Sequence, residues 1–273
     1  MNKKVLVIVV SYNGMRWLDR CLSSVADEAG LYVFDNDSTD GSADFVAAHY
    51  PQAKLVRSAE NLGFSKPNNL GFEYAVKHGY DYVYLLNQDA WLEPGALGKL
   101  VAAAEAHPEY GVLSPLQMTD GYKDLDRQFA KCYKKKITRL MAAHWLVPVG
   151  AIRAVGPFNE ELFPLYGQDD DWCNRARFAG WKLGVVPEAR AVHDRAYRQE
   201  AKERVVFRNY YTGSLVRLVN PGRPLCLQAA FVLLFTLVKA VKYRSFLPFK
   251  YFRTICGQWG AVKASRARAM HAR

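Results

Sequence analysis

The chain has 273 residues, half of them hydrophobic, which is enough for one large or two modest domains with a packed core. Its net charge of +11 comes from one end, because residues 204–273 carry 13 Lys and Arg and no acidic residue, whereas residues 1–203 carry 24 Lys and Arg against 26 Asp and Glu. A basic end suggests a polyanionic partner, either nucleic acid or an anionic membrane. Five cysteines without a CxxC pair argue against a disulfide framework and favour a reducing compartment.

The first 120 residues alternate between apolar runs and amphipathic segments. Five runs are typical of strands: 5–10, 31–34, 53–59, 82–86 and 110–118. Three segments have the apolar spacing of helices, 15–26, 43–50 and 94–107, and residues 61–79 are expected to be a loop entering a helix. Strands that alternate with helices indicate an α/β fold with a mainly parallel, Rossmann-like sheet flanked by helices. The N-terminal apolar run is six residues long and leads into a polar turn, so we do not expect it to be a signal peptide.

The rest of the chain is less regular. Residues 120–145 are basic and give no clear assignment, and residues 145–163 are expected to form a short strand followed by a turn. A helix closed by Gly180 is predicted from residue 168, followed by a strand pair or a strand and turn that ends at His193. The apolar run 225–238, with one Gln, is followed by Lys and Arg mixed with aromatic residues.

Polar side chains follow three of the predicted strands, in the sequences SYN, DND and NQD. Ligands of open α/β sheets bind at the carboxyl ends of the strands, so these residues are expected to surround one site. The chain has neither a GxxxxGK[ST] loop nor a GxGxxG turn after a strand. A nucleotide would therefore be held by side chains at the strand ends and by a metal ion that carries its phosphates.

Asp89, directly after the strand 82–86, is the candidate ligand of such an ion. Mg²⁺ and Mn²⁺ take few protein ligands, often carboxylates, and complete their shell with water and phosphate oxygens. His193, at the end of another predicted strand, could supply an imidazole. The ordinary alternatives are that Asp89 forms a turn or caps a helix, and that His193 is structural.

Three consecutive carboxylates, Asp169, Asp170 and Asp171, begin the helix predicted from residue 168, where they would favourably meet the helix dipole. Helical spacing places Asp171 four residues before Arg175, as in a surface ion pair, and Asp170 on a polar face. Asp169 lies on the apolar face, where a carboxylate is costly without a role or a partner. Partial burial would raise its proton affinity, which suits a general base.

Six motifs occur in an order and spacing that closely resemble family 2 glycosyltransferases, especially the bacterial rhamnosyltransferase-like branch. They are VIVVSYNG, VFDNDSTDGS, NLGFSKPNNLG, YLLNQDAWLEPGAL, VGAIRAVGPFNEELF and YGQDDDWCNRARFAGWKLGVVPEARAVHD, and together they cover roughly residues 4–210. The resemblance implies a GT-A fold, a nucleotide-sugar donor, a divalent metal and inversion at the anomeric carbon. It also implies a domain 1–210, followed by a basic and apolar helical extension over 211–273.

The resemblance assigns roles to individual residues. Tyr12, Asp35 and Asn36 would line the base and ribose pocket, and Lys66 would face the pyrophosphate.

In the metal motif, Asn87, Gln88 and Asp89 stand where the family has Asp-x-Asp, with Asp89 and His193 as metal ligands and Asn87 as a substrate-binding residue. Asn87 and Gln168 replace acidic residues of the family pattern, so metal dependence is expected to be weaker and the pKa of the base less raised by a neighbouring charge.

The catalytic base of the family corresponds to Asp169, in agreement with its helix face. Asp170, one residue away, remains the alternative base, and we also assign Trp172, on the face of Asp169, to the substrate site.

The expected reaction is inverting transfer of a sugar, with rhamnose as a candidate, from a dTDP- or UDP-sugar to a glycan or lipid-linked acceptor in cell-surface polysaccharide synthesis. The alternatives are a nucleotidyltransferase, which typically has a Gly-rich basic loop near its N-terminus, and an inactive nucleotide-sugar-binding partner, which Asn87 and Gln168 suggest.

Cations beside aromatic residues suit a membrane interface, and a 14-residue apolar run is too short to span a bilayer comfortably. We therefore expect a cytoplasmic protein held peripherally on the inner face of the cell membrane. A core-packing helix with a solvated basic end is the alternative, and nucleic acid is not expected because no recognition motif accompanies the charge.

Overall fold

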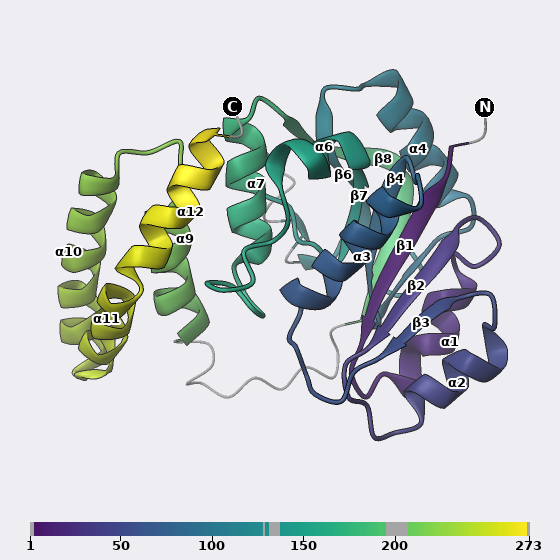
Figure 1. Cartoon of the computed structure of the whole chain (residues 1–273), viewed down its shortest axis with the longest axis horizontal. Helices are drawn as coiled ribbons and strands as arrows, with labels where there is room; N and C mark the ends of the chain where they lie inside the picture. The colour runs from purple at the N-terminus through teal and green to yellow at the C-terminus, as the bar shows by residue number, and fades with distance from the viewer. Residues whose placement is uncertain (1–2, 128, 131–136, 195–206, 272–273) are drawn as a thin grey trace.

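The computed structural model of the protein describes residues 3–127, 129–130, 137–194 and 207–271. These residues form one eight-stranded sheet in the order β3-β2-β1-β4-β7-β6-β8-β5, with helices on both faces (Figure 1). The strands are β1 (Val5–Ser11), β2 (Gly30–Asp35), β3 (Lys54–Arg57), β4 (Tyr82–Asn87), β5 (Ala90–Leu92), β6 (Tyr110–Met118), β7 (His144–Pro148) and β8 (Lys182–His193).

The strands pair in parallel where the sequence predicted it. β3, β2, β1 and β4 form a parallel block, and β6 and β8 also pair in parallel. β7 runs antiparallel to both β4 and β6, and β5 runs antiparallel to β8. The α/β class is confirmed. The three-residue β5 was not predicted, because so short a strand follows the polar residues 87–89 without a pattern of its own.

Two hydrophobic clusters flank the sheet, since successive residues of a strand point to opposite faces. Val7 and Val9 of β1 lie in the cluster covered by α1 (Met15–Ser23), α2 (Ser42–His49) and α4 (Ala96–Ala106). Leu6 and Ile8 lie in the cluster covered by α3 (Ser65–Lys77), α6 (Val149–Val155) and α7 (Gln168–Phe178). The site-bearing helices α3 and α7 therefore share one face of the sheet (Figure 1).

Three regions differ from the sequence prediction. Residues 149–155 form the helix α6. The sequence predicted a turn there, because seven residues are too few to display a helical period. β8 is one strand of 12 residues that ends at His193, rather than a strand pair or a strand and turn, with a register shift against β6 that lets it bend. In the unassigned segment 120–145, Leu125 bridges to Met118, while residue 128 and residues 131–136 lie outside the described residues.

The C-terminal extension is helical, as predicted. It contains the π-helical turn η1 (Phe207–Thr212) and the helices α9 (Gly213–Val219), α10 (Leu225–Tyr243), α11 (Leu247–Gly257) and α12 (Trp259–His271). A third hydrophobic cluster joins η1, α9, α10, α11 and α12 to Leu162 and Phe163, which lie just before α7. Tyr210 lies on the N-terminal side of the predicted boundary but packs in this cluster with the extension. The domain boundary after residue 210 therefore stays a prediction.

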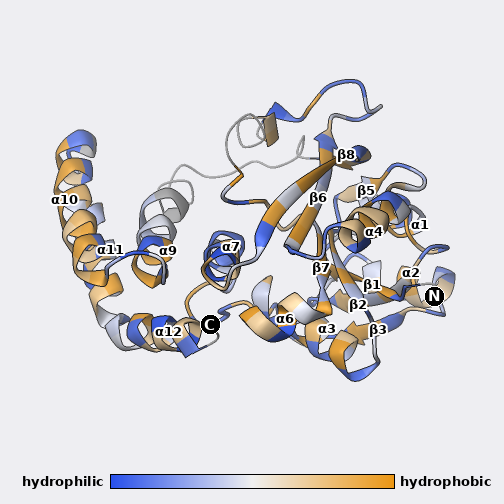
Figure 2. Ribbon diagram, turned by 90° about the horizontal axis from the view of Figure 1, so that it is seen from above, coloured by the Kyte–Doolittle hydropathy of each residue, from blue (hydrophilic) through white to orange (hydrophobic). Residues whose placement is uncertain are grey.

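Helix α10 is longer than the 14-residue apolar run 225–238 in the sequence. It has 19 residues, and over the described residues it is the helix that is long and apolar enough to cross a membrane by length and composition. Little of its apolar window is buried inside the protein. In Figure 2 it lies at the end of the molecule opposite α1 and α2 and is coloured mostly as hydrophobic.

Candidate active site

The polar ends of three strands meet at one edge of the parallel block, as the sequence predicted. The strand register places Ser11 beside Asp35, and Val10 beside Asn87. Because β1 lies between β2 and β4, these residues form a continuous polar rim at the carboxyl ends of the strands. Ligands of open α/β sheets bind at such a rim.

Gln88 fixes the backbone of the loop after β1. Its side-chain amide accepts a hydrogen bond from the Tyr12 amide at 2.8 Å and donates one to the Tyr12 carbonyl at 3.1 Å. The Tyr12 ring remains 48% exposed, so it can lie against a ligand. Gln88, the middle residue of the NQD motif, thus holds the loop that carries Tyr12 in place. The sequence did not indicate this role.

Asp35 and Asn36 end β2 in different ways. Oδ2 of Asp35 accepts a hydrogen bond from the Ser38 amide at 3.1 Å, whereas its buried Oδ1 has no hydrogen-bond partner among the described residues. A buried carboxylate oxygen without a partner is costly, so Oδ1 is available to a ligand hydroxyl.

The side chain of Asn36 is engaged inside the protein. It donates to Asn61 Oδ1 at 2.9 Å and to the Gly63 carbonyl at 2.8 Å, and it accepts from the Leu62 amide at 2.7 Å. Asn36 therefore shapes the loop before α3. Lys66, which follows this loop on the first turn of α3, is exposed and has no carboxylate partner among the described residues.

Asp89 and His193 lie together at the junction of β5 and β8. Oδ1 of Asp89 is 3.2 Å from Nε2 of His193, both residues are buried, and the Asp194 amide donates to the Asp89 carbonyl at 2.8 Å. The two residues were predicted to share a site from positions more than 100 residues apart. The described residues contain no group of three or more His, Cys, Asp or Glu arranged to hold a metal ion.

A second imidazole, His144, supports this pair and was missed from the sequence. Its Nε2 donates to the Val192 carbonyl at 3.1 Å, its Nδ1 accepts from the Tyr84 hydroxyl at 3.0 Å, and its ring meets that of His193 edge-on. His144 opens β7, and nothing in the irregular sequence around it marks the residue. It fixes the end of β8 from which His193 projects.

A cavity of about 620 Å³ adjoins His193. Arg20 lines this cavity. Its guanidinium stacks 3.8 Å from the centroid of the Trp91 ring and pairs with Asp120 at 2.8 Å. The indole of Trp17 donates to Asp194 at 3.0 Å. The sequence indicated Trp17 only as an apolar helix position.

Asp169 and Asp170 begin α7 with different surroundings. Burial raises the pKa of Asp169 to about 7, and the nearby Asp170 charge adds to the effect. Burial also raises the pKa of Asp170, but the Arg139 guanidinium, 3.5 Å away, opposes this shift. The like charge expected to be lost at Gln168 is thus supplied from Asp170. A carboxyl with a pKa near 7 can exchange a proton at neutral pH.

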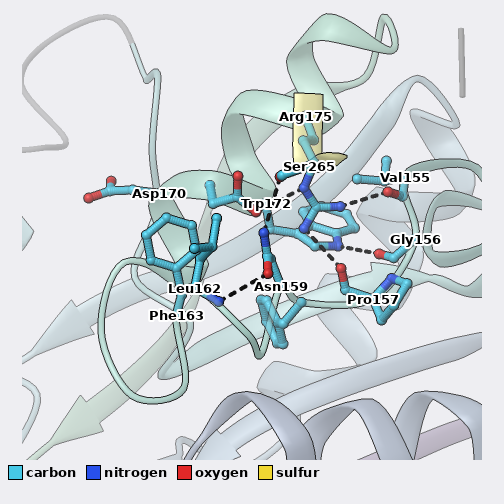
Figure 3. A network of polar contacts seen from close by, with 12 residues as sticks. Val155, Gly156, Pro157, Asn159, Leu162, Phe163, Asp170, Trp172, Arg175 and Ser265 are labelled. Atoms are coloured by element: carbon cyan, nitrogen blue, oxygen red, sulfur yellow. Dashed lines mark hydrogen bonds and ion pairs between the residues drawn. The ribbon is translucent and has the colours of Figure 1, made fainter. Parts of the chain in front are cut away.

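Two expectations about α7 are wrong: the surface position of the Asp171–Arg175 ion pair and the substrate contact of Trp172. Asp171 and Arg175 do form an ion pair, 2.9 Å apart, but it is buried rather than on the surface. Arg175 also donates to the carbonyls of Val155 and Pro157, at 2.7 and 2.9 Å (Figure 3). Helical spacing alone cannot show that the loop after α6 covers this face.

Trp172 is a core residue rather than a substrate contact. It is fully buried, packs against Trp145 and donates its indole N–H to the Gly156 carbonyl at 2.9 Å. In Figure 3, Trp172 and Arg175 point toward the loop 155–157, whereas Asp170 points away from it. The shared face of Asp169 and Trp172 was predicted correctly, but its partner is the protein interior.

Comparisons with known proteins agree with this arrangement. The model of glycosyl transferase family 2 matches residues 6–155. N-acetylglucosaminyl-diphospho-decaprenol L-rhamnosyltransferase of Mycobacterium tuberculosis is 29% identical over 236 residues, which covers 70% of this chain and 76% of that protein. The dTDP-rhamnosyl transferase RfbF of Shigella flexneri is 21% identical over 217 residues, 71% of this chain and 70% of that protein.

A solved structure extends the likeness to nearly the whole chain. The mannosyltransferase PcManGT from Pyrobaculum calidifontis, in complex with GDP-Man and Mn²⁺, superposes with a TM-score of 0.57 at 18% identity, covering 99% of this chain and 86% of that one. At this identity the likeness is one of fold.

Proposed function

Because this chain belongs to glycosyl transferase family 2 and has the GT-A fold, it is a glycosyltransferase, and we propose that it transfers L-rhamnose with inversion from a nucleotide donor to a lipid-linked acceptor. The sugar is chosen because two relatives, 29% and 21% identical, are rhamnosyltransferases by name. A dTDP-sugar is the donor we favour, with a UDP-sugar as the alternative. The family match gives no support to a nucleotidyltransferase.

The donor nucleoside is assigned to the rim formed by β1, β2 and β4. Asp35 Oδ1, buried without a protein partner, is suited to accept a hydrogen bond from a ribose hydroxyl or a base N–H. The exposed Tyr12 ring offers a face for the base. Lys66, exposed at the start of α3, supplies a positive charge for the diphosphate.

Asp89 and His193 fit a divalent ion. A carboxylate oxygen and an imidazole nitrogen converge within 3.2 Å, and an ion held by both would replace their direct contact. Two protein ligands suffice for Mg²⁺ or Mn²⁺ when water and donor phosphates complete the shell. When bound, the ion would neutralise the negative charge that develops on the departing nucleoside diphosphate.

The observation that carries the mechanism is the raised pKa of Asp169, about 7, at the start of α7. Asp169 removes the proton from the attacking acceptor hydroxyl, whose oxygen bonds to the anomeric carbon. The bond from that carbon to the diphosphate oxygen breaks on the opposite face, and the nucleoside diphosphate leaves with the electron pair. One displacement with one base inverts the centre without a covalent intermediate, as in the general-base half of inverting glycoside hydrolysis.

The acceptor is assigned as a lipid-linked glycan in cell-surface polysaccharide synthesis. The Mycobacterium tuberculosis relative is named for a decaprenol diphosphate that carries N-acetylglucosamine. An enzyme with such an acceptor works at a membrane, and the basic residues 204–273 would draw this chain to the anionic inner leaflet. We therefore place it peripherally at the cytoplasmic face of the cell membrane.

A direct assay tests this function. Purified protein with Mn²⁺ is given dTDP-rhamnose, UDP-glucose or UDP-N-acetylglucosamine with a polyprenyl-diphosphate-linked N-acetylglucosamine, and products are identified by mass spectrometry. The proposal predicts a product one deoxyhexose heavier from dTDP-rhamnose. Transfer from a UDP-sugar alone would reject rhamnose but keep the enzyme class, and neither transfer nor hydrolysis of any donor would favour the inactive nucleotide-sugar-binding partner.

A further inference from the structure

Helix α10 turns an apolar face away from the protein. Its exposed large apolar residues recur at steps of three and four, so that they form one stripe along the helix. The stripe consists of Leu227, Phe231, Leu234, Val238 and Val241, and Leu233 and Leu237 widen it. Contiguous apolar surface of this kind marks a site that contacts an apolar partner.

The opposite face of α10 packs on the protein through both apolar and polar side chains, with Val232 in the third hydrophobic cluster. The buried Thr236 donates its hydroxyl to the Val232 carbonyl at 2.7 Å and accepts a hydrogen bond from the Tyr210 hydroxyl. Gln228, also buried, accepts from Arg217 at 3.3 Å. The buried polar residues of α10 thus have partners inside the protein, whereas its exposed stripe is apolar, unlike the exposed face of a helix on a water-facing surface.

Cations follow this stripe in the sequence. Lys242 in the last turn of α10, Arg244 after it, and Lys250 and Arg253 on α11 are all exposed, and the described part of the extension contains no acidic residue. Phe246, in the turn between α10 and α11, is 87% exposed. Apolar side chains flanked by Lys, Arg and exposed aromatic rings match the boundary between lipid headgroups and acyl chains.

A second copy of the chain fits this surface less well. Two copies that met in parallel through their α10 stripes would bring two clusters of Lys and Arg together, whereas an antiparallel pairing would separate the clusters but offer them no acidic partner from the described part of the extension. Like charges placed together at an interface oppose association, whereas anionic headgroups are attracted to the same cluster. The charge around the stripe therefore selects the membrane.

We propose that α10 lies in the plane of an anionic bilayer surface, with the stripe Leu227–Val241 inserted and the cations at its end in contact with headgroups. At 1.5 Å per residue its 19 residues are about 28 Å long, so length alone would allow α10 to cross the hydrocarbon core. A spanning α10 would carry Thr236 and Gln228 away from Tyr210 and Arg217, which favours the in-plane arrangement. This proposal deepens the proposed membrane location but does not depend on the reaction at Asp169.

Flotation with vesicles tests the surface. The full chain is mixed, without substrates, with vesicles of phosphatidylcholine alone or of phosphatidylcholine and phosphatidylglycerol. We expect it to float with the anionic vesicles and to be only partly released by high salt. The charge-neutral double variant Leu234→Gln/Val238→Gln should lower the ratio of bound to free protein about tenfold, because two inserted side chains become polar.

The control introduces two glutamines on α12 instead. Ala264 and Ala267 are exposed there, away from the stripe, so Ala264→Gln/Ala267→Gln should float like the unchanged chain. Equal flotation of all three proteins, or none by the unchanged chain, would overturn the proposal whether or not the enzyme transfers sugar. A change from dimer to monomer in Leu234→Gln/Val238→Gln, with unchanged flotation, would identify the stripe as a dimer interface. Retention of the unchanged chain on the vesicles through an alkaline carbonate wash would show a spanning helix instead.

Discussion

Gly167, the residue before α7, packs against Thr212 at the end of η1. The φ of Gly167 is +90°, and a side chain there would meet the Thr212 methyl group and lie 2.9 Å from the Phe163 ring. The extension thus reaches the start of the helix that carries Asp169 two residues later. Ser65, at the start of α3, is tied to the same segment through its hydrogen bond to the Phe163 carbonyl. The segment 163–167 therefore links the extension to both Lys66 and Asp169.

Gly167→Ala should lower both stability and turnover. The left-handed backbone costs a non-glycine residue about 1–2 kcal/mol, and the clash with Thr212 adds to this cost and displaces the start of α7. The matched control is Gly79→Ala, where φ is +69° and the added Cβ has open space. Thermal unfolding should show a larger loss for Gly167→Ala, and kcat should fall only for that variant. Equal losses of stability and kcat in both variants would show that the contact between Gly167 and Thr212 contributes to neither.

Arg175→Met should destabilise the fold by about 3–5 kcal/mol, because it leaves the buried Asp171 carboxylate without its cation. The control, Arg177→Met on the same helix, removes an exposed cation and should change stability by less than about 0.5 kcal/mol. Arg175→Lys should rescue little, since an ammonium cannot replace the three directed contacts of the guanidinium. Denaturant unfolding measures the stability of all three variants. An unchanged midpoint for Arg175→Met would show that the Asp171–Arg175 ion pair does not stabilise the fold.

The pH dependence of kcat/KM should follow the protonation of Asp169. A general base works only when deprotonated, so activity should be maximal above the pKa of about 7 and fall about tenfold per pH unit below it. Asp170→Asn removes the like charge that helps raise this pKa, so the acid limb should move to lower pH while turnover remains. If the limb stays in place in Asp170→Asn, the two carboxylates do not interact in the enzyme.

Asp89→Ala should weaken Mn²⁺-dependent donor binding by at least about tenfold, and His193→Ala should weaken it less. Excess chelator should have the same effect on the unchanged enzyme. Calorimetric titration with the nucleoside diphosphate, with and without Mn²⁺, measures these affinities, and His49→Ala is a control at an exposed imidazole. Full activity in excess chelator would exclude the metal role of Asp89, and Asn87 in the metal motif makes this measurement informative.

The sequence was most informative where chemistry interrupts a buried pattern. Asp89 and the polar residues after β1 and β2 were recognised because they end apolar runs, and the parallel register then brings them together. His193 was first considered beside Asp89 because both follow predicted strands, and the family resemblance then assigned both as ligands of one metal ion. His144 was missed because its role depends on an antiparallel strand inside an unassigned segment.

The errors on α7 have one physical cause. Spacing along a helix shows which residues share a face, but it does not show what covers that face. Asp171 and Arg175 were expected in water and lie under the loop 155–157, and Trp172 was expected near substrate and packs in the core. In α10 the apolar run was recognised, but its outward orientation depends on the contacts of Thr236 and Gln228 with the rest of the extension.

The central claim is that Asp169 is the catalytic base, and the comparison of Asp169→Asn with Asp170→Asn tests it most directly. Single-turnover sugar transfer and equilibrium binding of the donor nucleotide are measured for both variants and for the unchanged chain. We predict that Asp169→Asn abolishes transfer and retains donor affinity, whereas Asp170→Asn keeps measurable transfer. Near-normal transfer by Asp169→Asn together with loss of transfer in Asp170→Asn would contradict the account and assign the base to Asp170.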